Sequence, residues 1–394
     1  MQCNRIATTL AALALTAQLA CPARAEEPVK IGVIAEFSGP FAEYGKQMEN
    51  GMKAYLAQNG DTVAGRKVEL ITRDTTGPAP EVAKRFAAEL ATREKVDFLV
   101  GFGLTPNAMA ATPISKEAKK PMIVMNAAAS VITTTSPYVV RVSQTIAQMS
   151  LPMAQWAAKN NIHKVYTLVA DYAPGKDAEE YFKKGFEAAG GQVVDSARVP
   201  LNNPDFAPFI QRIKDAKPEA VFLFLPAGEQ GVAFMKGFTE RGLAQAGIKV
   251  IGTGDLTDDG VLDAMGDPTL GVITAFHYSA AHDSPENRAF LKAYAGVAPN
   301  QRANFMAVAG YDGMAAIFEA LKKTGGDTDA DKVIAALKGW KHTSPRGPIE
   351  IDPETRDIIQ TVYIRRVERR DGHLYNIEFD QIPAVKDPGK EGAH

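Results

Sequence analysis

The side chains that could do chemistry gather in polar turns, each of which directly follows a short apolar run of strand type. These turns occupy residues 36–45, 101–107, 126–130, 171–175, 226–229 and 253–258. In an open α/β sheet, ligands bind in the crevice beyond the carboxyl ends of the strands. Small residues there let backbone N–H groups approach an anion, and the N-terminus of a following helix favours negative charge. Helix capping explains any one turn, for example at Thr105, Ser130 or Thr257, but together the turns predict a binding site for a small anion.

Signatures of catalysis are missing from the sequence. It contains no Gly-x-Ser-x-Gly elbow, no Walker A loop, no His-Glu-x-x-His and no Cys-x-x-Cys. Residues 101–103 begin like a dinucleotide fingerprint, but the third glycine is absent. His277 and His282 have no carboxylates at ligand spacing around them, so we expect no metal and no cofactor. Asp258 and Asp259 are interpreted as solvated loop charges. An exported hydrolase is the rival class, but it would need a nucleophile with a base in reach, and no such pair stands out.

The N-terminus has the three parts of a secretory signal peptide. Arg5 supplies positive charge, residues 6–20 form an apolar run, and residues 23–25 are a small-x-small cleavage site. We expect residues 1–25 to be removed and the rest of the chain to be exported to the periplasm. The apolar run is shorter than the roughly 20 residues that span a bilayer, which argues against the alternative of a retained anchor.

Both cysteines of the chain, Cys3 and Cys21, lie in the predicted signal peptide. The exported chain is then free of thiols, which excludes a disulfide framework, a thiolate metal site and a cysteine nucleophile. Lipidation of Cys21 is an alternative, although Gln18 stands where a lipobox has an aliphatic residue. Loss of the two positive charges Arg5 and Arg24 changes the formal net charge from −2 to −4. This mild charge gives no reason to expect nucleic acid or an anionic membrane as a partner.

The rest of the chain alternates between strand-like and helix-like periodicity, which predicts βαβ units and a parallel sheet. The expected strands are residues 29–34, 67–71, 97–100, 121–125, 164–170, 192–199, 220–225, 249–252, 272–276, 349–351 and 361–367. The expected helices are residues 45–60, 79–93, 107–118, 176–190, 206–216, 230–241, 286–295, 305–324 and 330–337. About 369 residues (394 minus 25) exceed the usual size of one hydrophobic core. The predicted fold class is therefore α/β, with two Rossmann-like doubly wound lobes and a ligand cleft between them.

The order and spacing of several motifs carry a resemblance to a known family. The motifs are Ile31-Gly32-Val33, Ser38-Gly39-Pro40, Tyr44-Gly45, residues 65–70 with Arg73-Asp74, Val100-Gly101 and residues 311–314. Through them the chain resembles the leucine/branched-chain amino-acid-type periplasmic binding proteins of ABC transporters, which have the type I periplasmic-binding fold. The resemblance covers nearly the whole exported chain. It implies two lobes that close about a hinge on a small carboxylate ligand and deliver it to an inner-membrane ABC permease.

The resemblance also implies domain boundaries. The N-terminal lobe is expected to comprise residues 26–143 plus 279–342, and the C-terminal lobe residues 144–278 plus 343–384. Residues 385–394, which are rich in Pro, Lys and Gly, are expected to fray. We expect a monomer. A membrane-tethered sensory domain is the less favoured role, because the sequence has no second hydrophobic segment.

Site residues follow from the same resemblance. In amino-acid binders of this family, the loops after the third and fourth strands hold the carboxylate, and they match Thr105 and residues 127–129. A tyrosine of the second lobe matches Tyr172, and an acidic residue that takes the α-ammonium matches Asp255. The candidate ligand-binding residues are Phe37, Phe102, Thr105, Asn126, Ala127, Ala128, Ala129, Tyr172 and Asp255.

The chain departs from the amino-acid pattern in the fourth loop. Ala129 stands where Thr is usual, and Asn126 replaces a small residue or proline. The loops are similar to those of a subgroup that binds aromatic carboxylates such as hydroxybenzoate- or phenylpropenoate-like acids, and several rings would make the cleft aromatic: Phe37, Phe41, Phe102, Tyr172 and Tyr278. Two ligand classes therefore stay open: a branched-chain or hydrophobic amino acid, and an aromatic carboxylate.

Overall fold

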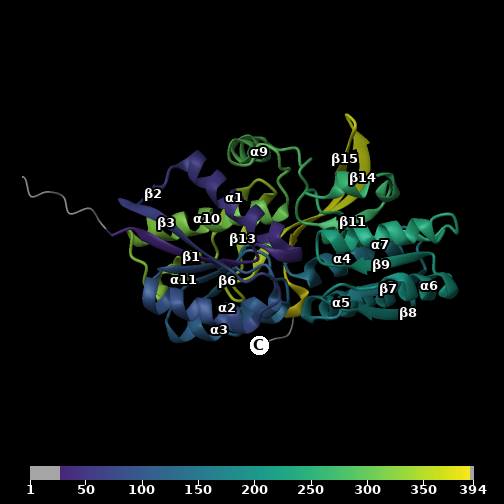
Figure 1. The fold of residues 1–394 in the computed structure, drawn as a ribbon, viewed down its shortest axis with the longest axis horizontal. Coiled ribbons are helices and arrows are strands. Elements are labelled where there is room, and N and C mark those ends of the chain that lie inside the picture. Colours follow the sequence, from purple (N-terminus) through teal and green to yellow (C-terminus); the bar gives the residue numbers. More distant parts are fainter. Residues whose placement is uncertain (1–26, 391–394) are drawn as a thin grey trace, which may run out of the picture.

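The computed structural model describes residues 27–390, which form two β-sheets side by side with helices packed on their faces (Figure 1). The predicted signal peptide, its cleavage site and Cys21 lie outside the described residues. Within residues 27–390, no helix is long and apolar enough to cross a membrane. Two sheets built largely from parallel strands and crossover helices confirm the predicted doubly wound α/β fold class.

Within the described residues, the first sheet has six strands in the order β2-β3-β1-β4-β5-β6. Strand β1 lies between β3 and β4 and is parallel to both. It is buried along nearly its whole length, which is why its sequence is almost continuously apolar. The strands are β1 Val29–Ala35, β2 Thr62–Val63, β3 Arg66–Asp74, β4 Phe98–Gly101, β5 Met122–Val124 and β6 Val139–Arg141. The helices between them are α1 Ala42–Asn59, α2 Pro80–Glu89 and α3 Thr105–Glu117.

The second sheet joins a parallel part to an antiparallel part. Strands β8, β7, β9, β10 and β11 are parallel neighbours, and β14 continues the sheet from β11 in the antiparallel direction, flanked by β13 and β15. The parallel strands are β7 Lys164–Ala170, β8 Gln192–Val199, β9 Ala220–Phe224, β10 Lys249–Thr253 and β11 Ile273–Phe276. The antiparallel strands are β12 Lys341–Ser344, β13 Gly347–Ile351, β14 Ile358–Arg370 and β15 His373–Val385. The helices are α4 Ile146–Lys159, α5 Ala173–Ala188, α6 Ala207–Ala216, α7 Glu229–Glu240 and α8 Leu262–Met265.

After β11 the chain returns to the first sheet, where α10 packs along α1 (Figure 1). A Cβ atom on Gly51 would lie 1.8 Å from the carbonyl oxygen of Ala307, and one on Gly310 would lie 2.1 Å from that of Met48. Such a close crossing accepts only glycine at both positions. The returning helices are α9 Pro285–Val297, α10 Phe305–Thr324 and α11 Ala330–Leu337, so the bounds predicted for α10 and α11 are confirmed.

A buried arginine ties the two lobes together where the chain crosses between them. Arg346, just after β12, donates to the Ser143 carbonyl oxygen at 3.0 Å and pairs with Asp312 of α10 at 3.0 Å. It also donates to Gln360 Oε1 of β14 at 2.9 Å. Because α10 packs on the first sheet and β14 belongs to the second, this single guanidinium contacts both lobes at the crossing.

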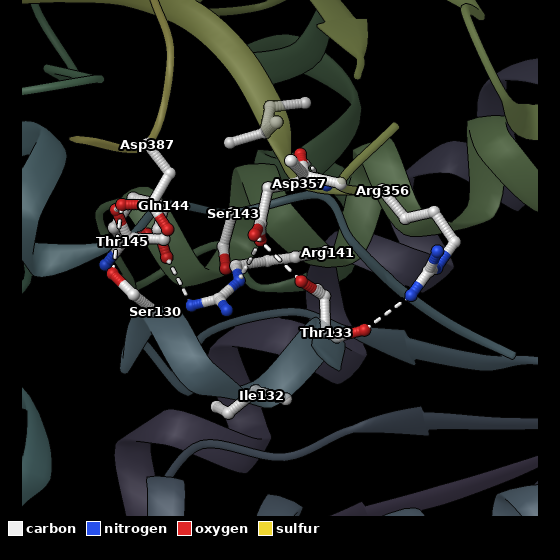
Figure 2. A network of polar contacts seen from close by, with 12 residues as sticks. Ser130, Ile132, Thr133, Arg141, Ser143, Gln144, Thr145, Arg356, Asp357 and Asp387 are labelled. Carbon is white, nitrogen blue, oxygen red and sulfur yellow. Dashed lines mark hydrogen bonds and ion pairs between the residues drawn. The ribbon is translucent and has the colours of Figure 1, made fainter. Parts of the chain in front are cut away.

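A second buried arginine lies in the polar network of Figure 2. Arg141, at the end of β6, pairs with Asp357 at 2.8 Å, and both side chains are almost fully excluded from solvent. Thr133 donates from its hydroxyl to the other carboxylate oxygen of Asp357 at 2.9 Å. The first sheet is thereby fixed to the loop that precedes β14.

The C-terminal segment completes this network. Asp387 is buried and accepts hydrogen bonds from the hydroxyls of Ser130 and Thr145, each at 2.9 Å (Figure 2). Lys390 pairs with Asp357 at 3.0 Å. The prediction that the tail frays from residue 385 is therefore wrong for residues 385–390, because their charged side chains find buried partners on segments from both lobes. Residues 391–394 lie outside the described part of the chain.

Candidate functional site

The two lobes meet at the carboxyl ends of their parallel strands. Tyr44 of α1 donates from its hydroxyl to the carbonyl oxygen of Ala227, which follows β9, at 3.3 Å. Asn304, which caps α10, donates to Asp258 at 2.9 Å. A pocket of about 380 Å³ opens beside these contacts and is lined by residues from both lobes. The turns that follow the strands therefore face one another across an interlobe cleft, where ligands bind in open α/β sheets.

Glu36 directly follows β1 and is fully buried. Its Oε1 atom accepts hydrogen bonds from Asn107 Nδ2 at 2.7 Å and from the Thr75 hydroxyl at 3.3 Å. Its Oε2 atom is also buried but has no hydrogen-bond partner within residues 27–390. Burial raises the pKa of Glu36 to about 7, although the hydrogen bonds from Asn107 and Thr75 oppose the rise. One oxygen of this carboxyl group is thus buried and unpaired among the described residues.

Gly103, in the turn between β4 and α3, leaves the space that Glu36 occupies. A Cβ atom on Gly103 would lie 2.0 Å from Glu36 Oε2 and 2.9 Å from the ring of Tyr44. The free oxygen and the Tyr44 ring therefore lie on the same side of this turn. Asn126, after β5, donates from Nδ2 to the Gly103 carbonyl oxygen at 2.7 Å, and its buried Oδ1 has no partner among the described residues.

Asp255 lies in the second lobe, in a 3-10 turn that directly follows β10. The Thr253 hydroxyl donates to its carboxylate at 2.9 Å. Burial raises the pKa of Asp255 to about 6, while the bond from Thr253 and the positive charge of Arg365 oppose the rise. The carboxylate is therefore mostly ionised at neutral pH.

The neighbouring acids are also buried, so the prediction that Asp258 and Asp259 are solvated loop charges is wrong. Asp258 accepts from Asn304 Nδ2 at 2.9 Å, and burial raises its pKa to about 7. Asp259 accepts from Asn376 Nδ2 at 3.0 Å, and burial raises its pKa as well. The cap of α10 and strand β15 cover this loop, and both are distant from it in the sequence.

Aromatic rings from both lobes adjoin these acids. Tyr172, which precedes α5, stacks on Phe224 with ring centres 5.9 Å apart and an angle of 16° between the planes. Burial, with the charge of Asp255, raises the pKa of Tyr172 well above its ordinary value. Burial likewise raises the pKa of Tyr44, and Tyr172, Asp255 and Glu36 contribute to that rise. These side chains are therefore close enough to interact electrostatically.

The loops expected to hold a carboxylate do come together. Thr105 is buried at the start of α3, and its Oγ1 accepts from the Ala129 N–H at 3.4 Å. The Ala127 N–H donates to the Phe102 carbonyl oxygen at 2.9 Å. Arg141 donates to the carbonyl oxygens of Ala127 at 3.1 Å and Ala129 at 2.8 Å. The N–H groups of Ala127 and Ala129 are therefore already used within the protein, and Ala128 lies buried between them.

The structure separates the two phenylalanines that were expected to line the cleft. Phe102 is fully buried in a hydrophobic cluster with Leu90 and Leu99, whereas Tyr44 belongs to a different cluster, so the Phe102 ring packs in the core rather than against Tyr44. Its backbone φ of 64° turns the side chain into the core beneath α2 and α3. Phe37 is half-buried, and its ring lies 2.9 Å from the position that a Cβ on Gly45 would take.

His277 lies in the segment that follows β11. It is fully buried, and neither ring nitrogen has a hydrogen-bond partner in the described part of the chain. Burial and the charges of Arg346 and Arg365 lower the pKa of His277 well below its ordinary value, so the ring is neutral. Among residues 27–390 there is no group of three or more His, Cys, Asp or Glu side chains that could hold a metal ion.

A family model described as periplasmic binding protein matches residues 28–373. The chain belongs to this family. The periplasmic binding protein is 46% identical over 383 residues to the Leu/Ile/Val-binding protein homolog 6 of Brucella melitensis, with 96% of this chain and 98% of the relative covered. It is therefore a solute-binding component of an ABC transporter, as the motifs predict.

Solved structures of solute-binding proteins of ABC transporters are similar to this periplasmic binding protein throughout. One from Rhodopseudomonas palustris BisB5, in complex with 3,4-dihydroxybenzoic acid, is 56% identical with a TM-score of 0.90 and covers 92% of this chain and 99% of its own. Another from R. palustris, in complex with 4-hydroxybenzoate, is 45% identical with the same TM-score and the same coverage. These similarities confirm the type I periplasmic-binding fold.

Sequence reasoning missed two members of the site in this periplasmic binding protein, Glu36 and Tyr44. Both lie in the first polar turn, residues 36–45, and Tyr44 belongs to a motif used for the resemblance. An acid placed directly after a buried strand was the available signal for Glu36. The signal for Tyr44 was its position in the first turn of α1, near the end of the first polar turn.

Proposed function

We propose that this periplasmic binding protein captures an aromatic carboxylic acid of the hydroxybenzoate type and delivers it to an inner-membrane ABC permease. The observation that carries the proposal is the placement of Tyr44 and of the stacked Tyr172–Phe224 pair, from opposite lobes, around buried acids. Stacked aromatic rings gain about 0.5–1.5 kcal/mol beyond the burial of their area. The ligands named for the 56% and 45% identical R. palustris proteins support the same chemical class.

A branched-chain or hydrophobic amino acid is the second candidate, and Asp255 favours it. A buried, mostly ionised carboxylate is the partner that an α-ammonium needs. The Leu/Ile/Val-binding names of the curated relatives point the same way. If this candidate is right, Asp255→Asn will abolish leucine binding while leaving the melting temperature of the free protein nearly unchanged.

We further propose that residues 26–143 plus 279–342 and residues 144–278 plus 343–384 move as two lobes that close on the ligand. The protein acts as a monomer in the periplasm after removal of residues 1–25, and it binds its ligand without catalysis. The proposed contacts are Phe37, Thr105, Asn126, Ala127, Ala128, Ala129, Tyr172 and Asp255, with Glu36 and Tyr44 in addition.

A thermal-shift screen of the purified protein tests the ligand class. The set is 4-hydroxybenzoate, 3,4-dihydroxybenzoate, benzoate, coumarate, leucine, valine and phenylalanine. A ligand at a hundredfold excess over its dissociation constant stabilises the folded state by about 2.7 kcal/mol, and we expect that shift with the aromatic acids. A shift with leucine alone would favour the second candidate, and no shift with any compound would overturn both. Turnover of a chromogenic ester, lost in Ser38→Ala, would instead favour an exported hydrolase.

A further inference from the structure

The first lobe presents two buried acceptor atoms without partners, on two side chains that both contact Gly103. Glu36 Oε2 lies 2.0 Å from the position that a Cβ on Gly103 would take, and Asn126 holds the Gly103 carbonyl through Nδ2. Glu36 Oε2 and Asn126 Oδ1 both lack a hydrogen-bond partner within residues 27–390. A buried acceptor left unpaired costs free energy. Two of them on side chains that contact one glycine therefore point to a ligand group that supplies the missing donor.

The geometry holds the Glu36 carboxyl group in place for such a ligand. Asn107 donates to its Oε1 at 2.7 Å and also donates to the Gly77 carbonyl oxygen at 2.9 Å, which fixes the amide. Thr75 donates to the same Oε1 at 3.3 Å. The carboxyl group cannot rotate freely without losing these bonds, so Oε2 stays directed toward Gly103 and the Tyr44 ring.

The two unpaired acceptor atoms require a hydrogen-bond donor from the ligand. Asn126 Oδ1 can only accept a hydrogen bond, and an ionised Glu36 can also only accept. A ligand carboxylate placed there would face two acceptors, whereas a ring hydroxyl would donate to one of them.

We propose that Glu36 Oε2 accepts a hydrogen bond from a ring hydroxyl of the ligand and selects hydroxylated aromatic acids over unhydroxylated ones. This inference rests on the proposed function, since it assigns one end of the aromatic ligand to the first lobe. A charge-assisted bond of this kind is about twice as strong as a neutral one. Its loss should therefore change the preference between ligands more than it changes binding of the bare ring.

Calorimetric titration with 4-hydroxybenzoate and 4-fluorobenzoate tests the inference, because fluorine replaces the hydroxyl at similar size but cannot donate. We expect the wild-type protein to prefer the hydroxyl compound by about tenfold or more. Glu36→Gln keeps an acceptor for Asn107 and Thr75 but turns an NH₂ group toward Gly103, and it should reduce that preference to about twofold or less. Glu81→Gln, an exposed glutamate at the start of α2, is the matched control and should keep the wild-type preference.

Gly103→Ala provides a second variant if Glu36→Gln does not fold, since the added methyl group displaces Oε2 and should abolish the same preference. Retention of the wild-type preference in Glu36→Gln, or an equal loss for both ligands, would overturn the inference but leave the proposed function standing. The same holds if the wild-type protein binds both compounds equally well. If the wild-type protein binds neither compound, the proposed function itself fails.

Discussion

At the scale of single residues, the candidate site contains carboxyl groups that the fold buries away from water. Burial raises the pKa of Glu36 to about 7, that of Asp255 to about 6 and that of Asp258 to about 7. An acid whose pKa is raised by folding binds more protons in the folded state than in the unfolded state. Its contribution to stability is fully present below the unfolded pKa and is lost as the pH rises through the folded pKa. The site therefore destabilises the ligand-free protein at neutral and alkaline pH.

The pH dependence of the free energy of unfolding tests whether the raised pKa of Glu36 destabilises the ligand-free protein. Each pKa unit corresponds to about 1.4 kcal/mol, so raising the pKa from 4.5 to about 7 should cost the wild-type protein about 2–3 kcal/mol between pH 5 and pH 8. We expect Glu36→Gln to escape this loss when the free energy of unfolding is measured by urea denaturation at both pH values. The buried His277 has a lowered pKa and opposes the trend below pH 6.5, but it is present in both proteins and cancels in the comparison. The same pH dependence in both proteins would contradict the raised pKa.

Sequence reasoning reached Asp255 but not Glu36, and the reason is physical. The burial of Glu36 depends on hydrogen bonds from Thr75 and Asn107, which lie 39 and 71 residues away along the chain. It also depends on Gly103, which provides the space. No local pattern records these distant partners. The direction of the Phe102 ring was not predictable for a similar reason, because a single positive φ decides which side of the turn the ring faces.

At the scale of elements, buried charged pairs hold the junction between the two lobes. Arg141 at the end of β6 contacts the loop before β14 through Asp357, and the segment after β15 adds Lys390 to the same carboxylate. Breaking one partner of a buried pair leaves an uncompensated charge, whereas breaking an exposed pair has little effect. Whether an ion pair is buried or exposed therefore determines how much its loss changes the free energy of unfolding.

Asp357→Asn should therefore destabilise the protein by about 3–5 kcal/mol, because it leaves the Arg141 guanidinium buried without its carboxylate. Glu350→Gln is the matched control, since Glu350 of β13 pairs with the exposed Lys341 at 3.4 Å and should change stability by about 1 kcal/mol or less. Urea unfolding midpoints of the two variants give the comparison. Similar small losses of stability in both variants would show that the buried Arg141–Asp357 pair does not stabilise the protein.

Elements were predictable where their signals are local. The bounds of α10 and α11 were predicted from apolar periodicity and agree with the structure. Strand β15 was missed, although Asp371-Gly372 lies between it and β14 with positive φ at both residues, and this dipeptide is a strong hairpin signal. The charged and Pro-rich composition after residue 382 suggested a loose end. Composition alone does not reveal that distant residues receive those charges.

On the scale of the whole molecule, the lobes are already in contact through Tyr44 and Ala227 at the cleft. If ligand binding closes the lobes, the ligand-free protein must populate a more open arrangement, in which this contact is broken. We expect the radius of gyration measured by X-ray scattering to decrease when 4-hydroxybenzoate is added. A ligand that binds by calorimetry without any change in the radius would contradict hinge closure.

The α/β class of the molecule follows from alternating strand and helix signals, and it was predicted. The mutual arrangement of the lobes depends on contacts such as Arg346 with Asp312 and Gln360, which join segments from three parts of the chain. Such contacts do not appear in any periodicity. The resemblance to a family supplied what the pattern of residues could not, namely that the turns of both lobes face one another.

The packing of the C-terminal segment has a practical consequence. Lys390 lies on Asp357 beside the crossing segments, so the described chain ends near the junction of the two lobes (Figure 1). A protein attached to a sensor surface through a linker at this end would be held near its pivot, and both lobes would stay free to move. Fluorophores on the outer helices α2 and α6 would then report the angle between the lobes rather than the motion of the whole molecule.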